Sequence, residues 1–170
     1  MLAVGPTYQT WRVTMDLSPQ DDVAICVVVA TYVATWNNKD LDGMHAIATD
    51  DVEWINVRGN DWRGKPVVYK GHAALLGSAL AKTTLETIEM RTRGVVPAVA
   101  LAVAKFRFGP LIVPGGKEIP SIVTIASFVM VLSNGAWKIK HFQNTIVDAE
   151  AEHNDPTTWE ETGYSRQKPA

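Results

Sequence analysis

One long apolar helix near the start of the chain constrains the fold most. Apolar side chains recur at helical spacing from Ile25 to Trp36, so one stripe of this helix must be buried. Ser18 and Pro19 form a start signal, because serine is a favoured N-cap and proline is tolerated in the first turn. The rest of the chain must therefore supply a surface that covers this stripe.

A short second helix and a strand are predicted next. Asp40 can cap a helix that carries Leu41, Met44 and Ile47. Strand alternation then puts three side chains on one face: Val52, Trp54 and Asn56. Asn56 is a polar group at the end of an apolar row. Burying a polar group costs free energy unless it is paired, so Asn56 is the first candidate functional residue.

Glycine and proline residues interrupt the pattern after this strand and predict a loop over 59–71. Two residues in this loop, Trp62 and Arg63, are candidates for the edge of a ligand site, although they could equally form a simple surface stack. A third helix is predicted from His72 to Lys82, because apolar side chains recur there at helical spacing.

Strand patterns fill the second half of the chain. Apolar and β-branched runs predict strands over 85–93, 98–108, 121–132 and 137–147. Asn134-Gly135, between the last two strands, is a strong hairpin signal. A long loop is predicted over 109–120. Helices followed by antiparallel strands imply an α+β fold.

Composition argues against several classes of function. A chain of 170 residues with a net charge of −2 is expected to form one domain, with no electrostatic reason to bind nucleic acid. The apolar run 23–33 is too short to span a bilayer, so no membrane partner is expected. The histidines lack metal-ligand spacing and no dinucleotide or phosphate motif is present, so we expect neither a metal nor a cofactor.

The chain divides into an N-terminal arm (1–17), a domain (18–147) and a polar C-terminal tail (148–170). The tail is expected either to be loosely ordered or to dock as an arm. Cys26 is the single cysteine and is expected to act as a small buried side chain. With no intrachain disulfide possible and no evident leader pattern, a cytoplasmic protein is expected.

The run TYVATWNNKDLDGMHAIATDDVEW resembles the opening of the ketosteroid-isomerase-like superfamily, also called nuclear transport factor 2-like or SnoaL-like. The resemblance extends from about Pro19 to Val147. The segments INVRGNDWRG and NGAWKIKHFQNT look most like its SgcJ/EcaC branch. The resemblance implies a cone-shaped α+β barrel of the cystatin-like type, with three N-terminal helices on a curved, mostly antiparallel sheet. It also implies a homodimer that pairs through the sheets.

In the isomerases of this superfamily, a helix Tyr and a strand carboxylic acid donate hydrogen bonds to a carbonyl oxygen, while an Asp moves the proton. By resemblance, Tyr32 matches the helix Tyr. Asn56 stands where the Asp would be, and Ala126 or a near neighbour stands where the donor acid would be. Since an amide is no useful base, the steroid-isomerase reaction is not expected here.

A pocket with different polar groups is expected instead. Its aromatic lining is predicted to come from Tyr32, Trp36, Trp54, Phe128 and Phe142. Its polar contacts are predicted to come from Asn56, Asn144 and His72, and such a mixture suits a flat, mostly apolar molecule with one or two oxygens. The aromatic residues could instead be ordinary core residues that contact no ligand. Asn56 could instead make a structural hydrogen bond to Tyr32 or to a buried water.

His72 is the candidate proton carrier. Members of the SgcJ/EcaC branch often have a His after the W-R-G motif, which here is 62–64. A capping or surface position for His72 stays open.

The last strand has two possible registers. Alignment of the final hairpin puts Phe142, Asn144 and Ile146 inward and His141 outward. A slip of one residue would reverse these faces.

These features predict a small-molecule pocket protein that binds a hydrophobic, oxygen-bearing ligand. One reading is an isomerase, cyclase, dehydratase or hydrolase with Tyr32, Asn56 and His72 as catalytic residues. The alternatives are a non-catalytic binding domain and a dimerisation module with no pocket ligand.

Overall fold

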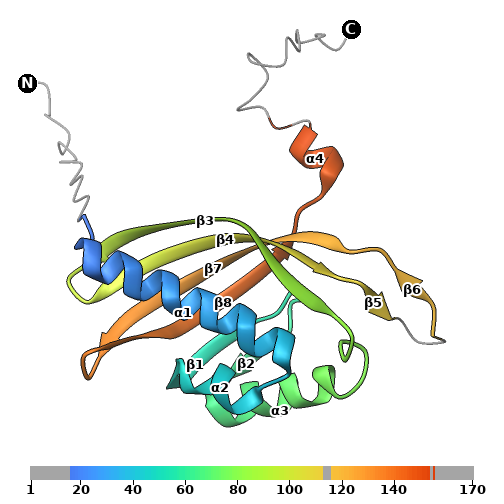
Figure 1. The fold of residues 1–170 in the computed structure, drawn as a ribbon, viewed down its shortest axis with the longest axis horizontal. Coiled ribbons are helices and arrows are strands. Elements are labelled where there is room, and N and C mark those ends of the chain that lie inside the picture. Colours follow the sequence, from blue (N-terminus) through green and yellow to red (C-terminus); the bar gives the residue numbers. More distant parts are fainter. Residues whose placement is uncertain (1–15, 113–115, 154, 156–170) are drawn as a thin grey trace, which may run out of the picture.

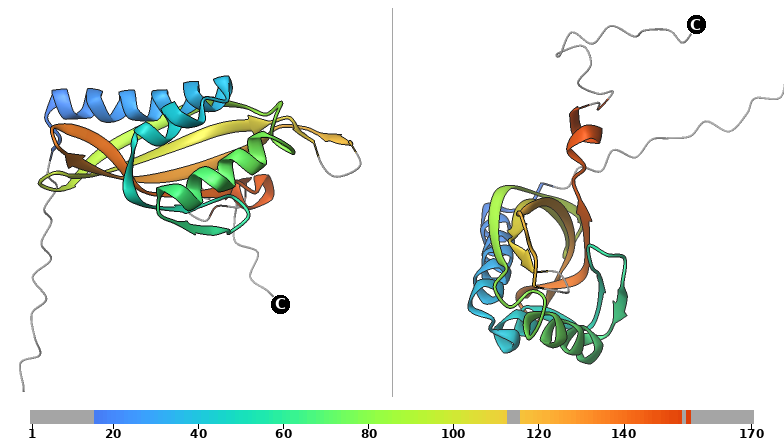
Figure 2. Two further views of the ribbon diagram at one scale, coloured as in Figure 1. Left: turned by 90° about the horizontal axis from the view of Figure 1, so that it is seen from below. Right: turned by 90° about the vertical axis from the view of Figure 1, so that its right-hand side faces the viewer.

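Three helices lie against a strongly curved sheet in the computed structural model, which describes residues 16–112, 116–153 and 155 (Figure 1). The first helix runs along the concave side of the sheet, and the next two lie together at one end (Figure 2). The sheet stays open between its two edge strands. The predicted α+β cone is therefore confirmed, with an incompletely closed wall.

The first two helices follow their start signals. Helix α1 spans Pro19–Asn38, and the Ser18 hydroxyl accepts the backbone N–H of Asp21 at 3.1 Å. Helix α2 spans Leu41–Ala46, and the Asp40 carboxylate accepts the backbone N–H of Gly43 at 2.9 Å. Side-chain oxygens thus satisfy backbone donors that the first turns of both helices leave free.

A six-stranded sheet forms the body of the protein, in the order β2-β1-β8-β7-β4-β3. All neighbouring pairs are antiparallel except β1 with β8, which is parallel. A separate two-stranded ribbon pairs β5 with β6. The strand bounds are β1 Ala48–Ile55, β2 Asp61–Arg63, β3 Thr84–Val96, β4 Val99–Gly109, β5 Leu111–Ile112, β6 Glu118–Ile119, β7 Ile122–Ser133 and β8 Ala136–Ile146.

The predicted loop over 59–71 is wrong, and the predicted third helix is present but has other bounds than His72 to Lys82. Strand β2 occupies part of that stretch, and helix α3 spans Lys65–Leu76. Pro66 lies in the first turn of α3, where a missing N–H costs nothing, so it starts a helix instead of breaking one. Gly71 lies inside α3, where a Cβ would approach the Trp62 ring to 2.7 Å. Because Gly71 has no side chain, the Trp62 ring can pack directly against helix α3.

The predicted loop over 109–120 also needs correction, because it contains β5 and β6. These strands are two residues each, below the length at which a sequence pattern becomes visible. Residues 113–115, between them, lie outside the described part.

The core lies between α1 and the concave face of the sheet. The α1 stripe supplies Ile25 and Val29, at 0% and 1% exposure, and the sheet supplies Phe106, Phe128 and Ile139. The Trp137 indole donates to the Asp21 carboxylate at 2.8 Å, which ties the start of α1 to β8. Cys26, expected to be buried, is only half-buried.

The ends of the chain are described only in part. A short helix α4, Ala149–His153, follows β8, and Glu152 pairs there with Lys105 of β4. The predictions for the arm and for most of the tail fall on residues outside the described ranges. Within those ranges, no helix has both the length and the apolar character needed to cross a membrane.

Candidate functional site

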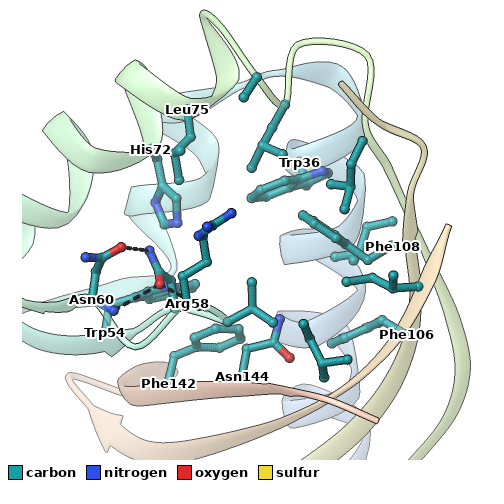
Figure 3. Close-up of a pocket in the computed structure, with 18 of the residues that line it drawn as sticks. Trp36, Trp54, Arg58, Asn60, His72, Leu75, Phe106, Phe108, Phe142 and Asn144 are labelled. Carbon is teal, nitrogen blue, oxygen red and sulfur yellow. Dashed lines mark hydrogen bonds between the residues drawn. The ribbon is translucent and has the colours of Figure 1, made fainter. Parts of the chain in front are cut away.

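A pocket of about 210 Å³ opens between the end of α1, helix α3 and the concave face of the sheet (Figure 3). Its wall is mainly aromatic and aliphatic, and the described residues that line it include no Asp or Glu. The lining residues used below are Tyr32, Trp36, Trp54, Asn56, Arg58, Asn60, Trp62, His72, Leu75, Phe106, Phe108, Phe142 and Asn144.

Helix α1 brings Tyr32 to the wall of the pocket. The ring is 4% exposed and contacts Trp54 and Phe142 at centroid distances of 5.6 Å each. Within the described residues its hydroxyl has no hydrogen-bond partner, although the side chain lines the pocket. Burial raises the pKa of Tyr32 above its ordinary value. The hydroxyl therefore stays protonated and can donate a hydrogen bond to a ligand oxygen.

Helix α3 brings His72 to the opposite wall. It is 2% exposed, and its ring meets the Trp54 ring edge-to-face at 4.9 Å. Burial, with a smaller effect of the neighbouring His45, lowers the pKa of His72 to about 3. The imidazole is neutral at pH 7, because its charged form has lost its hydration.

His45 of α2 is the direct partner of His72. The His45 Nε2 and His72 Nδ1 atoms are 3.3 Å apart, and burial lowers the pKa of His45 as well. One of the two nitrogens donates to the other, so the pair has two tautomeric arrangements. In one arrangement the Nε2 atom of His72 is a donor, and in the other it is an acceptor. No third His, Cys, Asp or Glu in the described ranges joins them to form a metal site.

Asn56 follows the last residue of β1, and its side chain makes hydrogen bonds that hold the next turn together. Its Oδ1 accepts the backbone N–H groups of Arg58 and Asn60 at 3.0 and 3.1 Å. Its Nδ2 donates to the Asn60 side chain at 3.1 Å. Asn56 still lines the pocket, but most of its hydrogen-bonding capacity is committed. Tyr32, considered from the sequence as its partner, is not bonded to it.

The last strand has the register that the alignment predicts. Phe142, Asn144 and Ile146 line the pocket, whereas His141 lies beside Glu53 of β1 with an Nδ1–Oε2 distance of 3.6 Å. The Phe142 ring stacks on Trp54 at 3.9 Å. Within the described residues the buried Asn144 Oδ1 atom has no hydrogen-bond partner, so it is an unused acceptor.

The other predicted site residues divide into two groups. Trp36 and Trp62 line the pocket. Phe128 is fully buried behind Tyr32 and Phe142, outside the lining, and Arg63 pairs with Asp61 at 2.7 Å with a side chain that is 75% exposed. Neither Phe128 nor Arg63 is therefore in position to contact a ligand in this pocket.

Sequence reasoning missed several lining residues and the partner of His72. Phe106 and Phe108 alternate on β4, and that alternation was a usable signal for one inward face. His45 had no such signal, because its contact with His72 joins residues that are 27 apart in sequence. Arg58 and Asn60 occupy the turn after β1, and a turn has no periodic pattern that shows which of its side chains face a pocket.

The fold and this site define a class: small α+β proteins in which a curved sheet and its first helix enclose an apolar pocket. The SnoaL-like domain family matches residues 29–139, and the chain belongs to that family. A search of proteins with curated descriptions found no match.

Solved structures share this fold. An uncharacterized protein with a cystatin-like fold from Caulobacter vibrioides is 29% identical, with 79% of this chain and 95% of that chain covered and a TM-score of 0.75. A ketosteroid isomerase-like protein from Erwinia carotovora atroseptica is 14% identical, covering 77% and 99%, with a TM-score of 0.66. A type 2 hexachlorocyclohexane dehydrochlorinase is 16% identical, covering 76% and 86%, with a TM-score of 0.68. The fold is thus the cystatin-like α+β cone.

Proposed function

We propose that this protein binds a small, mostly apolar molecule bearing a carbonyl or hydroxyl oxygen, and that it moves a proton on that molecule. The observation that carries the proposal is a set of three polar side chains within a mainly apolar lining: Tyr32, Asn144 and His72. Groups of this kind fix the orientation of a ligand whose affinity comes from apolar contact.

Tyr32 and His72 have distinct parts in the proposed reaction. The protonated Tyr32 hydroxyl donates to the ligand oxygen, where negative charge would develop if a proton left a neighbouring carbon. His72 exchanges the proton, with His45 Nε2 able to give or take a hydrogen on the far side of the ring. No cofactor is invoked. Isomerisation, cyclisation and dehydration all include such a proton transfer.

The SgcJ/EcaC branch is proposed on the segments INVRGNDWRG and NGAWKIKHFQNT. In this chain the first segment forms the end of β1, the turn braced by Asn56 and strand β2. The second forms the hairpin turn and most of β8. Both segments thus contribute to one end of the pocket wall.

A second function, ligand binding without catalysis, has its own support. Among the described residues no Asp or Glu lines the pocket, and a histidine whose pKa lies near 3 is a weak base at neutral pH. A protein that only carries an apolar ligand does not need a stronger proton acceptor than the His72 imidazole.

Two measurements on one ligand panel separate these functions. Binding of cyclic ketones is followed by tryptophan fluorescence, because Trp36, Trp54 and Trp62 all line the pocket. Exchange of ketone C–H for C–D in D₂O is followed by NMR with wild type, His72→Gln and Tyr32→Phe. Exchange that both substitutions slow supports catalysis. Binding without exchange supports the carrier, and no binding by any ketone contradicts both functions.

A further inference from the structure

One cation, Arg58, lies at the pocket without an ion-pair partner among the described residues. Arg58 lines the pocket, and its side chain extends from the loop after β1 across the space below His72 and Trp36 (Figure 3). A guanidinium is charged at any physiological pH. In the described part of the chain it has no ion-pair partner, whereas neighbouring Arg63 is paired with Asp61.

The loop is built so that Arg58 keeps this place. The Asn56 side chain accepts the N–H groups on both sides of the turn, from Arg58 and Asn60, and the Asn56 backbone N–H donates to the Asn60 carbonyl at 3.0 Å. The Gly59 N–H also donates to the Asn56 carbonyl at 2.8 Å, and Gly59 has a φ of 81°, which glycine adopts without strain. The polar residue that ends the apolar row of β1 therefore holds the backbone from which Arg58 projects.

The surrounding electrostatics favour an anion. The His72 imidazole, the Tyr32 hydroxyl and the amides of the lining asparagines are all neutral. No carboxylate lines the pocket in the ranges that the structure describes. Arg58 is thus the single charged side chain among the described lining residues. An apolar wall excludes water and so weakens the screening of a charge pair formed against it.

We propose that the natural ligand carries a carboxylate at one end, which pairs with Arg58 at the mouth while its apolar body enters between Trp36, Phe108 and Phe142. This inference rests on the proposed function, since it assigns the ligand class of the same pocket. A planar carboxylate matches the two parallel N–H groups of a guanidinium. The carbonyl or hydroxyl oxygen of the body then meets Tyr32 deeper in the pocket.

Two ligands of the same shape test the charge. 2-Naphthoate and 2-naphthamide differ in charge but little in size, and titration calorimetry gives both dissociation constants. Because Arg58 is exposed on one side, wild type should bind 2-naphthoate about fivefold more tightly than 2-naphthamide at 20 mM salt. At 500 mM salt this preference should shrink, because salt screens exposed charges.

Three variants assign the effect to Arg58. Arg58→Gln should bring the ratio of the 2-naphthamide and 2-naphthoate dissociation constants to about one, and Arg58→Lys should keep part of the preference for 2-naphthoate. Arg91→Gln, on exposed strand β3 outside the pocket, makes the same change in net charge and should keep all of it. Circular dichroism confirms that each variant is folded. Equal binding of the two ligands by wild type, or an unchanged preference in Arg58→Gln, would overturn the proposal.

A fourth variant separates this proposal from the one on which it rests. Leu75→Trp fills the pocket and should abolish binding of both naphthalenes. If wild type binds 2-naphthamide in a Leu75-dependent way but shows no preference for 2-naphthoate, the proposed function stands and the carboxylate inference fails. If neither compound binds wild type, both fail.

Discussion

At the scale of single residues, the environment of His72 makes a prediction about pH. The group is protonated in the unfolded chain below its ordinary pKa of 6.5 but stays neutral in the folded protein until its pKa of about 3. The unfolded state therefore binds more protons between these values, and stability should fall as pH decreases through that window. The expected loss from His72 alone is about 1.5 kcal/mol between pH 6.5 and pH 5. Urea unfolding at both pH values measures it.

The control for this measurement is His72→Gln. Between pH 6.5 and pH 5 this variant should lose about 1.5 kcal/mol less unfolding free energy than wild type does. His45 is the other titratable group that faces His72, and its pKa, lowered by burial, adds a slope common to both proteins. Identical pH dependence in wild type and the variant would show that His72 titrates normally in the folded state.

The free hydroxyl of Tyr32 makes a second prediction at this scale. Tyr32→Phe keeps the aromatic contacts and removes only the donor, so the fold should be unaffected. Affinity for 2-acetylnaphthalene should fall about fivefold, the value of one neutral hydrogen bond, and affinity for the oxygen-free 2-ethylnaphthalene should stay constant. Titration of both compounds checks this, and an equal loss for both would mean that the substitution disturbs packing.

At the scale of elements, Gly71 controls how closely α3 approaches β2. A Cβ at this position would lie 2.7 Å from the Trp62 ring, and overpacking of this size costs about 1–3 kcal/mol. Gly71→Ala should therefore destabilise the protein, although alanine normally stabilises a helix. In a Trp62→Leu background the same change should cost less. A double-mutant cycle by urea unfolding measures this coupling, and additive effects would exclude the contact as the cause.

The elements differ in how far their sequences predicted them. Helix α1 and the β7–β8 hairpin were predictable because a cap, a stripe and Asn134-Gly135 are local signals. Helix α3 was not, since Pro66 and Gly71 look like loop residues until Trp62 is known to pack on the glycine. For the same reason the identity of many wall residues could be predicted, but not the contact of His72 with His45 or the unpaired charge of Arg58. Those depend on segments that only the tertiary fold brings together.

At the scale of the whole molecule, the convex face of the sheet is expected to bury itself in a homodimer. Neighbouring strands β4 and β7 place Leu101 beside Val129 and Val99 beside Val131, and all four are only half-buried. An apolar face of this kind is normally covered. Leu101→Glu should convert a dimer to a monomer in light scattering, whereas Val27→Glu on exposed α1 should not. A wild-type protein that is monomeric at all concentrations would contradict this.

The strand order has a last consequence, for solubility. A sheet that does not close has two free edges, which are ready templates for aggregation. One edge, β2, is only three residues long. The other, β3, has thirteen residues but carries Glu86, Glu89, Arg91 and Arg93 along its length. Edge β2 is thus protected by its shortness and edge β3 by its charged side chains, so replacement of these four charged residues with valine should promote fibril growth.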